Sequence, residues 1–182
     1  MDYFKSKLVP GAEIFPYSDY LPFLTPIVDQ LGGSKEGHFI QEEREVFGSE
    51  EFAIAPAICY ESIYGEYVGE FSKKGANIIS VSTNDAWWYD TPGYKQLLAY
   101  TQLRAIENRK WIARSANTGI SCFINPKGEI VKQTKWEEAT SIGIDVPLIN
   151  GSTFYARNGD YISRTAIFIA SLLLMLTFVR KF

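Results

Sequence analysis

Histidine and cysteine are scarce in this sequence, and no excess of basic residues is present. The 182 residues include one histidine, His38, and two cysteines, Cys59 and Cys122. These are too few for a structural zinc site or a disulfide framework, so we expect no metal ion and no cofactor. Lys and Arg together number 18 against 21 Asp and Glu, which leaves no surplus charge to neutralise phosphates. We therefore expect no nucleic-acid partner.

The rest of the composition is that of a folded chain. Hydrophobic residues make up 46% and charged residues 21%, a balance that excludes a disordered protein. At about 150 residues per domain, the length predicts one domain and an appendage. We place the domain over residues 1–160 and the appendage over residues 161–182.

The appendage contains a long apolar run. Residues 166–179 carry no charge, and the stretch that starts at Tyr161 is 19 residues long. A helix of that length spans about 28 Å, against a hydrocarbon core of about 30 Å. A buried C-terminal helix is the alternative, but the lack of a polar face and the closing Arg180-Lys181 favour a membrane span.

The domain has the apolar periodicity of an α/β protein. Strands are expected over residues 52–59, 77–82, 119–124, 129–133 and 141–146, and helices over 61–74 and 94–116. The first strand, the first helix and the next strand form a βαβ unit, which implies parallel pairing. The strands over 119–124 and 129–133 form a β-hairpin around a turn at 125–128.

Cys59 is a candidate nucleophile because of where it stands. It ends an apolar strand directly before a predicted helix, where the helix dipole and free N–H groups lower a thiol pKa and bind an oxyanion. A buried structural cysteine is the alternative at this position. Cys122 lies inside a predicted strand, and we assign it to the core.

A thiol nucleophile also needs a base. His38 stands in a glycine-rich loop, where a solvated surface histidine is expected. Lys5, Glu13 and Glu61 are the other candidates, although each of them alone is typical of a surface charge.

These residues belong to a series of motifs that follow one another in a specific order. The series is Tyr3–Pro10, Glu13, Ala57–Glu61, Ser82–Trp87, Arg104–Glu107, Ala116–Ile120, Pro126–Glu129 and Tyr155–Asp160, followed by the apolar run. It resembles the carbon–nitrogen hydrolase (nitrilase) superfamily over essentially the whole chain. Within that superfamily it is most similar to the apolipoprotein N-acyltransferase family, because soluble nitrilases lack the terminal span.

The resemblance implies a fold and a set of site residues. The fold is a nitrilase-like α-β-β-α sandwich, of which this chain holds the C-terminal portion, followed by one transmembrane helix. The family's Glu–Lys–Cys triad places its nucleophile at Cys59 and its lysine at Lys5, which stabilises an oxyanion together with the backbone N–H of Tyr60. The acidic positions that support the family's site fall on Glu13 and Glu61. The segment that lines it falls on Asn84, Asp85 and Trp87.

The resemblance also implies substrates and a location. A phospholipid donates an acyl chain to the cysteine as a thioester, and the N-terminal amine of a diacylglyceryl-cysteine apolipoprotein accepts it. The location implied is the bacterial inner membrane, with the catalytic domain on the periplasmic side.

Some features depart from the family pattern. Gly11-Ala12 stand where the family commonly has Phe-Gly, and Trp88-Tyr89 follow where it often has Phe-Gly. The family's triad glutamate and the first half of its sandwich precede the lysine motif, so we expect the isolated chain to be incomplete and inactive. A membrane-anchored amidase or nitrilase-type hydrolase and a non-catalytic fragment are the alternatives.

Overall fold

The computed structural model describes residues 2–10, 13–14, 40–49 and 51–179. His38 lies outside the described residues. The strands are β1 (Phe47–Gly48), β2 (Ala53–Ile58), β3 (Ile78–Thr83), β4 (Ile112–Ala116), β5 (Cys122–Ile124) and β6 (Ile130–Gln133). The α-helices are α2 (Gly65–Lys73), α3 (Pro92–Asn108), α4 (Phe154–Asn158) and α5 (Tyr161–Val179), and the short 3₁₀ helices are η2 (Cys59–Ile63) and η3 (Asp85–Trp88).

The strands form one mixed sheet in the order β1-β2-β3-β4-β5-β6. The pairs β2–β3 and β3–β4 are parallel, and the other pairs are antiparallel. The βαβ unit and the β5–β6 hairpin predicted from the sequence are thereby confirmed. Because the parallel strands run in the same direction, the segments that follow β2, β3 and β4 meet at one edge of the sheet.

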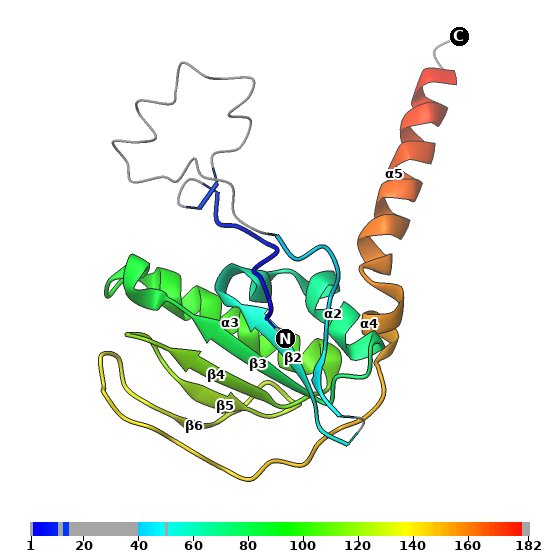
Figure 1. The fold of residues 1–182 in the computed structure, drawn as a ribbon. Coiled ribbons are helices and arrows are strands. Elements are labelled where there is room, and N and C mark those ends of the chain that lie inside the picture. The colour runs from blue at the N-terminus through cyan, green and yellow to red at the C-terminus, as the bar shows by residue number, and fades with distance from the viewer. Residues whose placement is uncertain (1, 11–12, 15–39, 50, 180–182) are drawn as a thin grey trace.

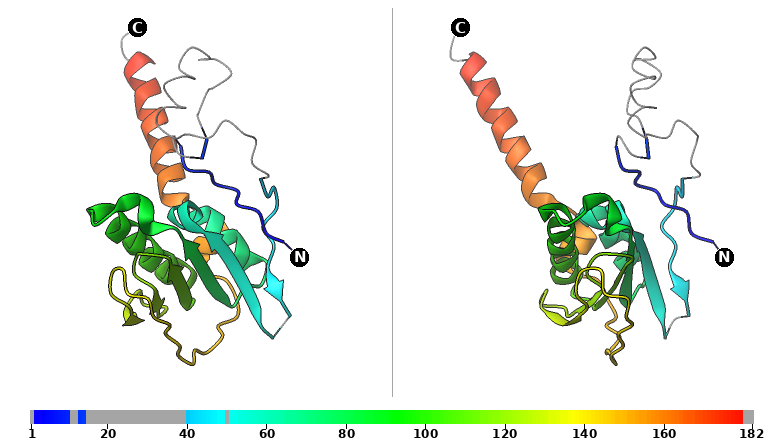
Figure 2. Two further views of the ribbon diagram at one scale, coloured as in Figure 1. Left: turned by 60° about the vertical axis from the view of Figure 1, so that its left-hand side comes forward. Right: turned by 90° about the vertical axis from the view of Figure 1, so that its left-hand side faces the viewer.

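Helices α2 and α3 pack on one face of the sheet (Figures 1 and 2). The side chains of β2 alternate accordingly, with Ala53, Ala55 and Ala57 buried and the intervening residues half-buried. Phe71 of α2 and Ile79 of β3 are among the largest side chains of the core, and both are fully buried. One sheet and its helical layer are the two layers expected from the C-terminal portion of the sandwich.

The helix predicted over 94–116 is too long. Helix α3 ends at Asn108, and Arg109 follows in the left-handed conformation with a φ of 51°. Ile112, which continues the apolar stripe of that helix in the sequence, is instead a buried residue of β4. A left-handed residue after a helix is usually Gly, so no stop signal is visible in the sequence at this point.

Two other elements differ from the prediction. Residues 141–146 alternate apolar and polar side chains but form no strand in the described structure. The helix predicted over 61–74 is divided: η2 ends at Ile63, Tyr64 is extended, and α2 begins at Gly65.

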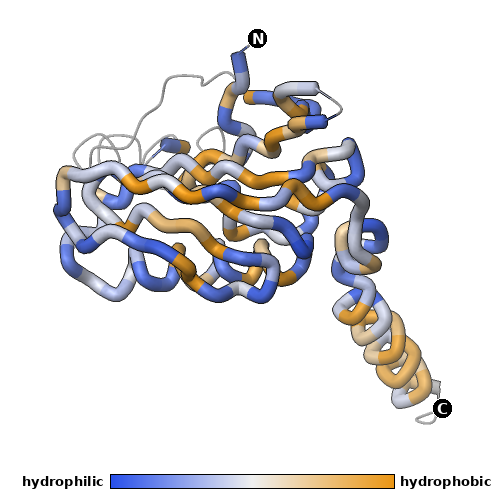
Figure 3. Tube along the Cα trace, turned by 90° about the horizontal axis from the view of Figure 1, so that it is seen from below, coloured by the Kyte–Doolittle hydropathy of each residue, from blue (hydrophilic) through white to orange (hydrophobic). Residues whose placement is uncertain are grey.

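Helix α5 leaves the domain and extends alone beyond it (Figures 1 and 2). Its 19 residues match the predicted apolar stretch, and residues Tyr161–Phe178 are not buried against the rest of the protein. Figure 3 shows that the outer turns of α5 are mostly hydrophobic, whereas the turns next to the domain also contain hydrophilic residues. By its length and composition, α5 is therefore long and apolar enough to cross a membrane.

Deleting residues 166–179 is expected to weaken membrane attachment without unfolding the domain. The deleted residues carry most of the apolar surface of α5, and α5 buries nothing against the sheet. Alkaline extraction of membranes measures attachment, and thermal melting by circular dichroism measures the domain. If the deletion variant stays with membranes as the parent does, α5 is not a membrane span. If the variant melts at a lower temperature than the parent, α5 is part of the core.

Candidate active site

A cavity of about 670 Å³ lies where β2 and β3 end, at the carboxyl edge of the parallel strands. Segments far apart in the sequence contribute to it: the N-terminal segment, the β2–η2 junction, η3 and the end of β4. Of the predicted site residues, those that line it are Lys5, Glu13, Cys59, Tyr60, Asn84 and Trp87. Glu61 and Asp85 do not line it.

Cys59 occupies the turn between β2 and η2 in an unusual backbone conformation. Its φ of 52° lies in the left-handed region, which costs a residue with a Cβ atom about 1–3 kcal/mol. The turn is held by the Ser62 hydroxyl, which donates to the Cys59 carbonyl at 2.8 Å. A sharp strand-to-helix turn of this kind presents its side chain at the sheet edge, and the half-buried Cys59 lines the cavity.

The helix after Cys59 is shorter than predicted. η2 is a five-residue 3₁₀ helix, and α2 starts six residues after Cys59. The helix dipole at the Cys59 thiol is therefore weaker than the sequence suggests. The feature that distinguishes Cys59 from Cys122 is the left-handed turn in which Cys59 lies.

Cys122 is a core residue, as predicted. Its side chain is buried in β5. Burial raises the pKa of this thiol to about 11; Arg114 lowers it in part, and Asp85 raises it further. Near neutral pH the Cys122 thiol is thus protonated and out of contact with solvent, so Cys59 is the cysteine available for chemistry.

Lys5 and Glu13 form an ion pair inside the cavity. The Lys5 ammonium donates to Oε1 of Glu13 at 2.7 Å and to Oε2 at 2.5 Å, and the Val9 N–H donates to the same carboxylate at 2.7 Å. The Lys5 side chain is 14% exposed and that of Glu13 is 32% exposed. Because the carboxylate holds the ammonium in a half-enclosed space, Lys5 is a fixed positive charge in the cavity that also contains Cys59.

Glu61 does not line the cavity and is completely buried. One carboxylate oxygen accepts the Ser6 N–H at 2.5 Å and the Tyr67 hydroxyl at 2.7 Å, and the other accepts the Ile58 N–H at 2.7 Å. Ser6 follows Lys5, and Ile58 precedes Cys59. The carboxylate therefore joins the two chain segments that carry the predicted lysine and nucleophile.

Asp85 is predicted from the sequence to line the site, but it points into the protein. Its carboxylate pairs with Arg114 at 2.8 Å, both side chains are fully buried, and the Thr83 hydroxyl donates to it at 3.0 Å. A Cβ atom at Gly119 would lie 1.9 Å from the Asp85 carboxylate, so only glycine fits there. Asp85 thus anchors η3 to β4 beneath the cavity.

Further lining residues were not predicted. Trp88 and Leu97 add to the apolar wall, and Asn117 donates to Asn84 at 2.7 Å across the edge. Asn117 could have been predicted from the sequence, because this residue directly follows β4 and the carboxyl ends of parallel strands lie at the same edge of a sheet. The other unpredicted lining residues are Val9, Ile58, Ser82 and Thr83.

The far end of η2 is fixed by a buried ion pair. Arg104 of α3 donates to the Ile63 carbonyl at 3.1 Å and to Glu107 at 2.9 Å. Burial lowers the pKa of Arg104 and raises the pKa of Glu107, and in each case the partner charge opposes the shift. The turn that carries Cys59 is therefore held at both ends, by Glu61 near its start and by Arg104 at Ile63.

A comparison against protein families finds a match that covers most of the chain. Residues 3–150 match the family model described as carbon-nitrogen hydrolase. This chain belongs to the carbon–nitrogen hydrolase family. Among solved structures, a nitrilase-superfamily amidase from Nesterenkonia sp. AN1 aligns with a TM-score of 0.53 over 90% of this chain and 56% of that chain. At 17% identity, this likeness supports the fold alone.

Several curated relatives of this carbon–nitrogen hydrolase are apolipoprotein N-acyltransferases. Apolipoprotein N-acyltransferases from Chlorobaculum tepidum and Pasteurella multocida are 34% and 35% identical over 98% and 96% of this chain. The matched regions make up 34% and 32% of those proteins. The chain thus spans about a third of the length of the curated relatives it matches.

Replacing Glu61 with Gln is expected to destabilise the domain by about 1–3 kcal/mol. The Gln side chain has the same shape as Glu, but its NH₂ group faces a backbone N–H that donates to the carboxylate in the parent. Two donors then face each other, and one hydrogen bond is lost. Chemical denaturation followed by tryptophan fluorescence measures the change. Glu42→Gln, at an exposed position, is the matched control. Equal stability of the parent and both variants would show that the hydrogen bonds of the Glu61 carboxylate do not stabilise the domain.

Proposed function

We propose that this chain carries the nucleophile-bearing part of an apolipoprotein N-acyltransferase. The observation that carries the proposal is the cavity in which Cys59, the Lys5–Glu13 ion pair and an apolar wall lie together. The names of the curated relatives support it. The candidate membrane helix supports it as well, because the acyl donor is a membrane lipid.

The first half-reaction loads the cysteine. The Cys59 thiol gives its proton to a carboxylate base, and Sγ attacks the ester carbonyl carbon of a phospholipid. The Lys5 ammonium and the Tyr60 N–H stabilise the oxyanion of the tetrahedral intermediate. The ester C–O bond then breaks, the leaving oxygen takes the proton from the base, and a lysophospholipid departs from an acyl thioester.

The second half-reaction transfers the acyl group. The free α-amine of a diacylglyceryl-cysteine apolipoprotein attacks the thioester carbonyl and forms a C–N bond. The C–S bond breaks, and the proton lost by the amine returns through the base to the Cys59 thiolate. The product is an amide, and the enzyme is restored without any cofactor.

The wall of the cavity suits an acyl chain better than a small polar amide. Trp87, Trp88 and Leu97 supply apolar surface, and Lys5 with Glu13 supplies charge. An acyl ester has the same division between hydrocarbon and polar carbonyl. We propose a bacterial inner-membrane location with the catalytic domain on the periplasmic side, where lipoprotein N-termini are exposed.

Cys59→Ala is expected to abolish acyl transfer, whereas Cys122→Ala retains it. The chain is completed to the length of its relatives and assayed in detergent with a labelled phospholipid and a diacylglyceryl-cysteine peptide. Labelled N-acyl peptide is the product measured. Product from Cys59→Ala defeats the proposal, and release of labelled free fatty acid without any acylated peptide supports a hydrolase instead.

Lys5→Arg is expected to lower turnover at least about a hundred-fold, although the charge is kept. The guanidinium is broad and planar, so it cannot take the place of a compact ammonium between Glu13 and the oxyanion. The same transfer assay measures the loss. Lys127→Arg, at an exposed turn, is the control. Near-normal turnover of Lys5→Arg would show that Lys5 does not stabilise the oxyanion.

The 182-residue chain by itself is expected to give no acylated peptide. Glu13 is the one carboxylate among the described residues that line the cavity, and it is already bonded to Lys5 and Val9. The resemblance to the carbon–nitrogen hydrolases implies a triad glutamate that precedes the lysine motif. Comparing this chain with an upstream-extended one in the transfer assay tests the point, and equal activity would make Glu13, the carboxylate that lines the cavity, the base.

A further inference from the structure

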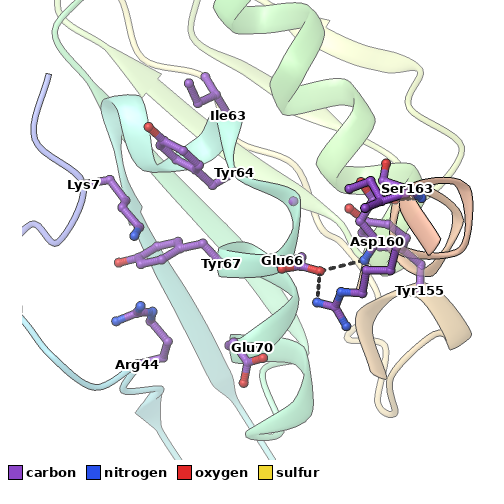
Figure 4. A pocket seen from close by; sticks show the side chains of 13 residues that line it. Lys7, Arg44, Ile63, Tyr64, Glu66, Tyr67, Glu70, Tyr155, Asp160 and Ser163 are labelled. Carbon is purple, nitrogen blue, oxygen red and sulfur yellow. Dashed lines mark hydrogen bonds and ion pairs between the residues drawn. The ribbon is translucent and has the colours of Figure 1, made fainter. Parts of the chain in front are cut away.

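A second pocket, of about 660 Å³, lies where α5 leaves the domain, and it shares no residue with the catalytic cavity. Tyr60 of the cavity and Tyr64 of the pocket pack edge to face at 5.5 Å, so these two rings stand between the two spaces. The pocket is lined by cationic, aromatic and apolar side chains, among them Lys7, Arg44, Tyr64, Tyr67, Arg164 and Ile167 (Figure 4).

The carboxylates of this pocket already have partners. Glu66 pairs with Arg164 at 2.5 Å and accepts the Asp160 N–H at 2.7 Å. Glu70 pairs with Lys73 at 2.6 Å. Asp160 accepts the N–H of Ser163 at the start of α5, and hydrogen bonds from the side chain and then the backbone of Ser163 lower the pKa of Asp160.

Two cations of the pocket have no carboxylate partner in the described part of the chain. Lys7 lies 5.6 Å from the centre of the Tyr64 ring and 5.9 Å from that of Tyr67, and Arg44 lies 4.1 Å from Tyr67. Figure 4 shows the Tyr67 ring between them. Arg44 donates through Nη1 to the carbonyls of Gln41 and Glu42, while its buried Nε has no hydrogen-bond partner among the described residues. The pocket therefore holds a pair of positive charges over aromatic rings.

The place of these charges relative to α5 indicates their ligand. Ser163, Arg164 and Ile167 of the first two turns of α5 line the pocket, and no charged residue follows in the described helix. If α5 crosses a bilayer, its first turns lie at the level of the lipid headgroups and Ile167 begins the apolar part. Lipid phosphates lie at that level, and Lys and Arg bind phosphate through charge-assisted hydrogen bonds.

We propose that this pocket binds the phosphate of a membrane phospholipid through Lys7 and Arg44, with the acyl chains of the lipid lying along α5 from Ile167 onward. The ligand is a lipid that holds the domain against the bilayer, in a site apart from the cavity of Cys59. The inference rests on α5 as a membrane span and not on the acyl-transfer chemistry. Because the phosphate is the recognised group, phosphatidylethanolamine and phosphatidylglycerol are both expected to bind.

The test measures bound lipid and not activity. The chain, completed to the length of its relatives, is reconstituted in nanodiscs of phosphatidylethanolamine and phosphatidylglycerol, and the lipids retained after transfer to detergent are counted by native mass spectrometry. Lys7→Gln/Arg44→Gln is expected to lose one retained phospholipid and to bind added lipid at least about ten-fold more weakly. Lys127→Gln/Lys135→Gln removes the same charge at exposed positions and is expected to match the parent.

A single variant and two competitors complete the experiment. Within the protein, Lys7→Gln alone removes only the contacts of Lys7 with the tyrosine rings. It therefore replaces the double variant if that variant does not melt cooperatively. Lys7→Arg is expected to restore binding. Inorganic phosphate and glycerol phosphate are added as competitors, and neither is expected to displace the lipid at millimolar concentration. The proposal is overturned by equal lipid retention in parent and variants, by a parent that retains no lipid, or by displacement with free phosphate.

Discussion

The carboxylate of Glu61 is the contact on which the candidate site depends. It is completely buried, and it accepts backbone N–H groups from Ser6 and Ile58, which are 52 positions apart in the chain. Burying a charge is costly unless hydrogen bonds compensate it, and here three donors do so. These bonds hold the segment of Lys5 beside the end of β2. The arrangement of the proposed site therefore depends on one buried acid that itself does not line the cavity.

Buried charges also form the other supports of the cavity. Asp85 and Arg114 connect η3 to β4 with both side chains fully buried, and Arg104 fixes the last carbonyl of η2. Breaking a buried pair leaves an uncompensated charge, so these contacts specify one arrangement more than they add stability. We propose a different role for the charges around the start of α5, because they lie where a lipid surface is expected if α5 crosses a membrane. In this proposal, buried charges hold the candidate site in place, and more accessible charges contact the lipid.

Much of the fold could be predicted because its signals are local. The βαβ unit, the hairpin and α5 follow from apolar periodicity, composition and turn residues within short windows. The end of α3 could not be predicted, since Arg109 adopts a left-handed conformation that normally favours glycine and Ile112 continues the apolar spacing into β4. Residues 141–146 have the alternation of a strand, but a strand also needs a partner, which the sequence does not reveal.

The site was predictable to the extent that motif order identifies it. Cys59, Lys5, Glu13, Tyr60, Asn84 and Trp87 do meet in one cavity. The orientation of Asp85 depends on Arg114, and that of Glu61 on Ser6 and Ile58, and such long-range pairs leave no local pattern. The sequence therefore assigns acidic residues to the site without separating those that line it from those that hold it in place.

The most direct measurement is the mass of the protein after it meets phospholipid in the absence of an acceptor. The completed chain is incubated with a phospholipid of defined acyl length, digested, and analysed with and without hydroxylamine, which cleaves thioesters. The proposed mechanism predicts one acyl adduct on the peptide that contains Cys59, removed by hydroxylamine. An adduct on another residue, or one that persists in Cys59→Ala, would contradict it.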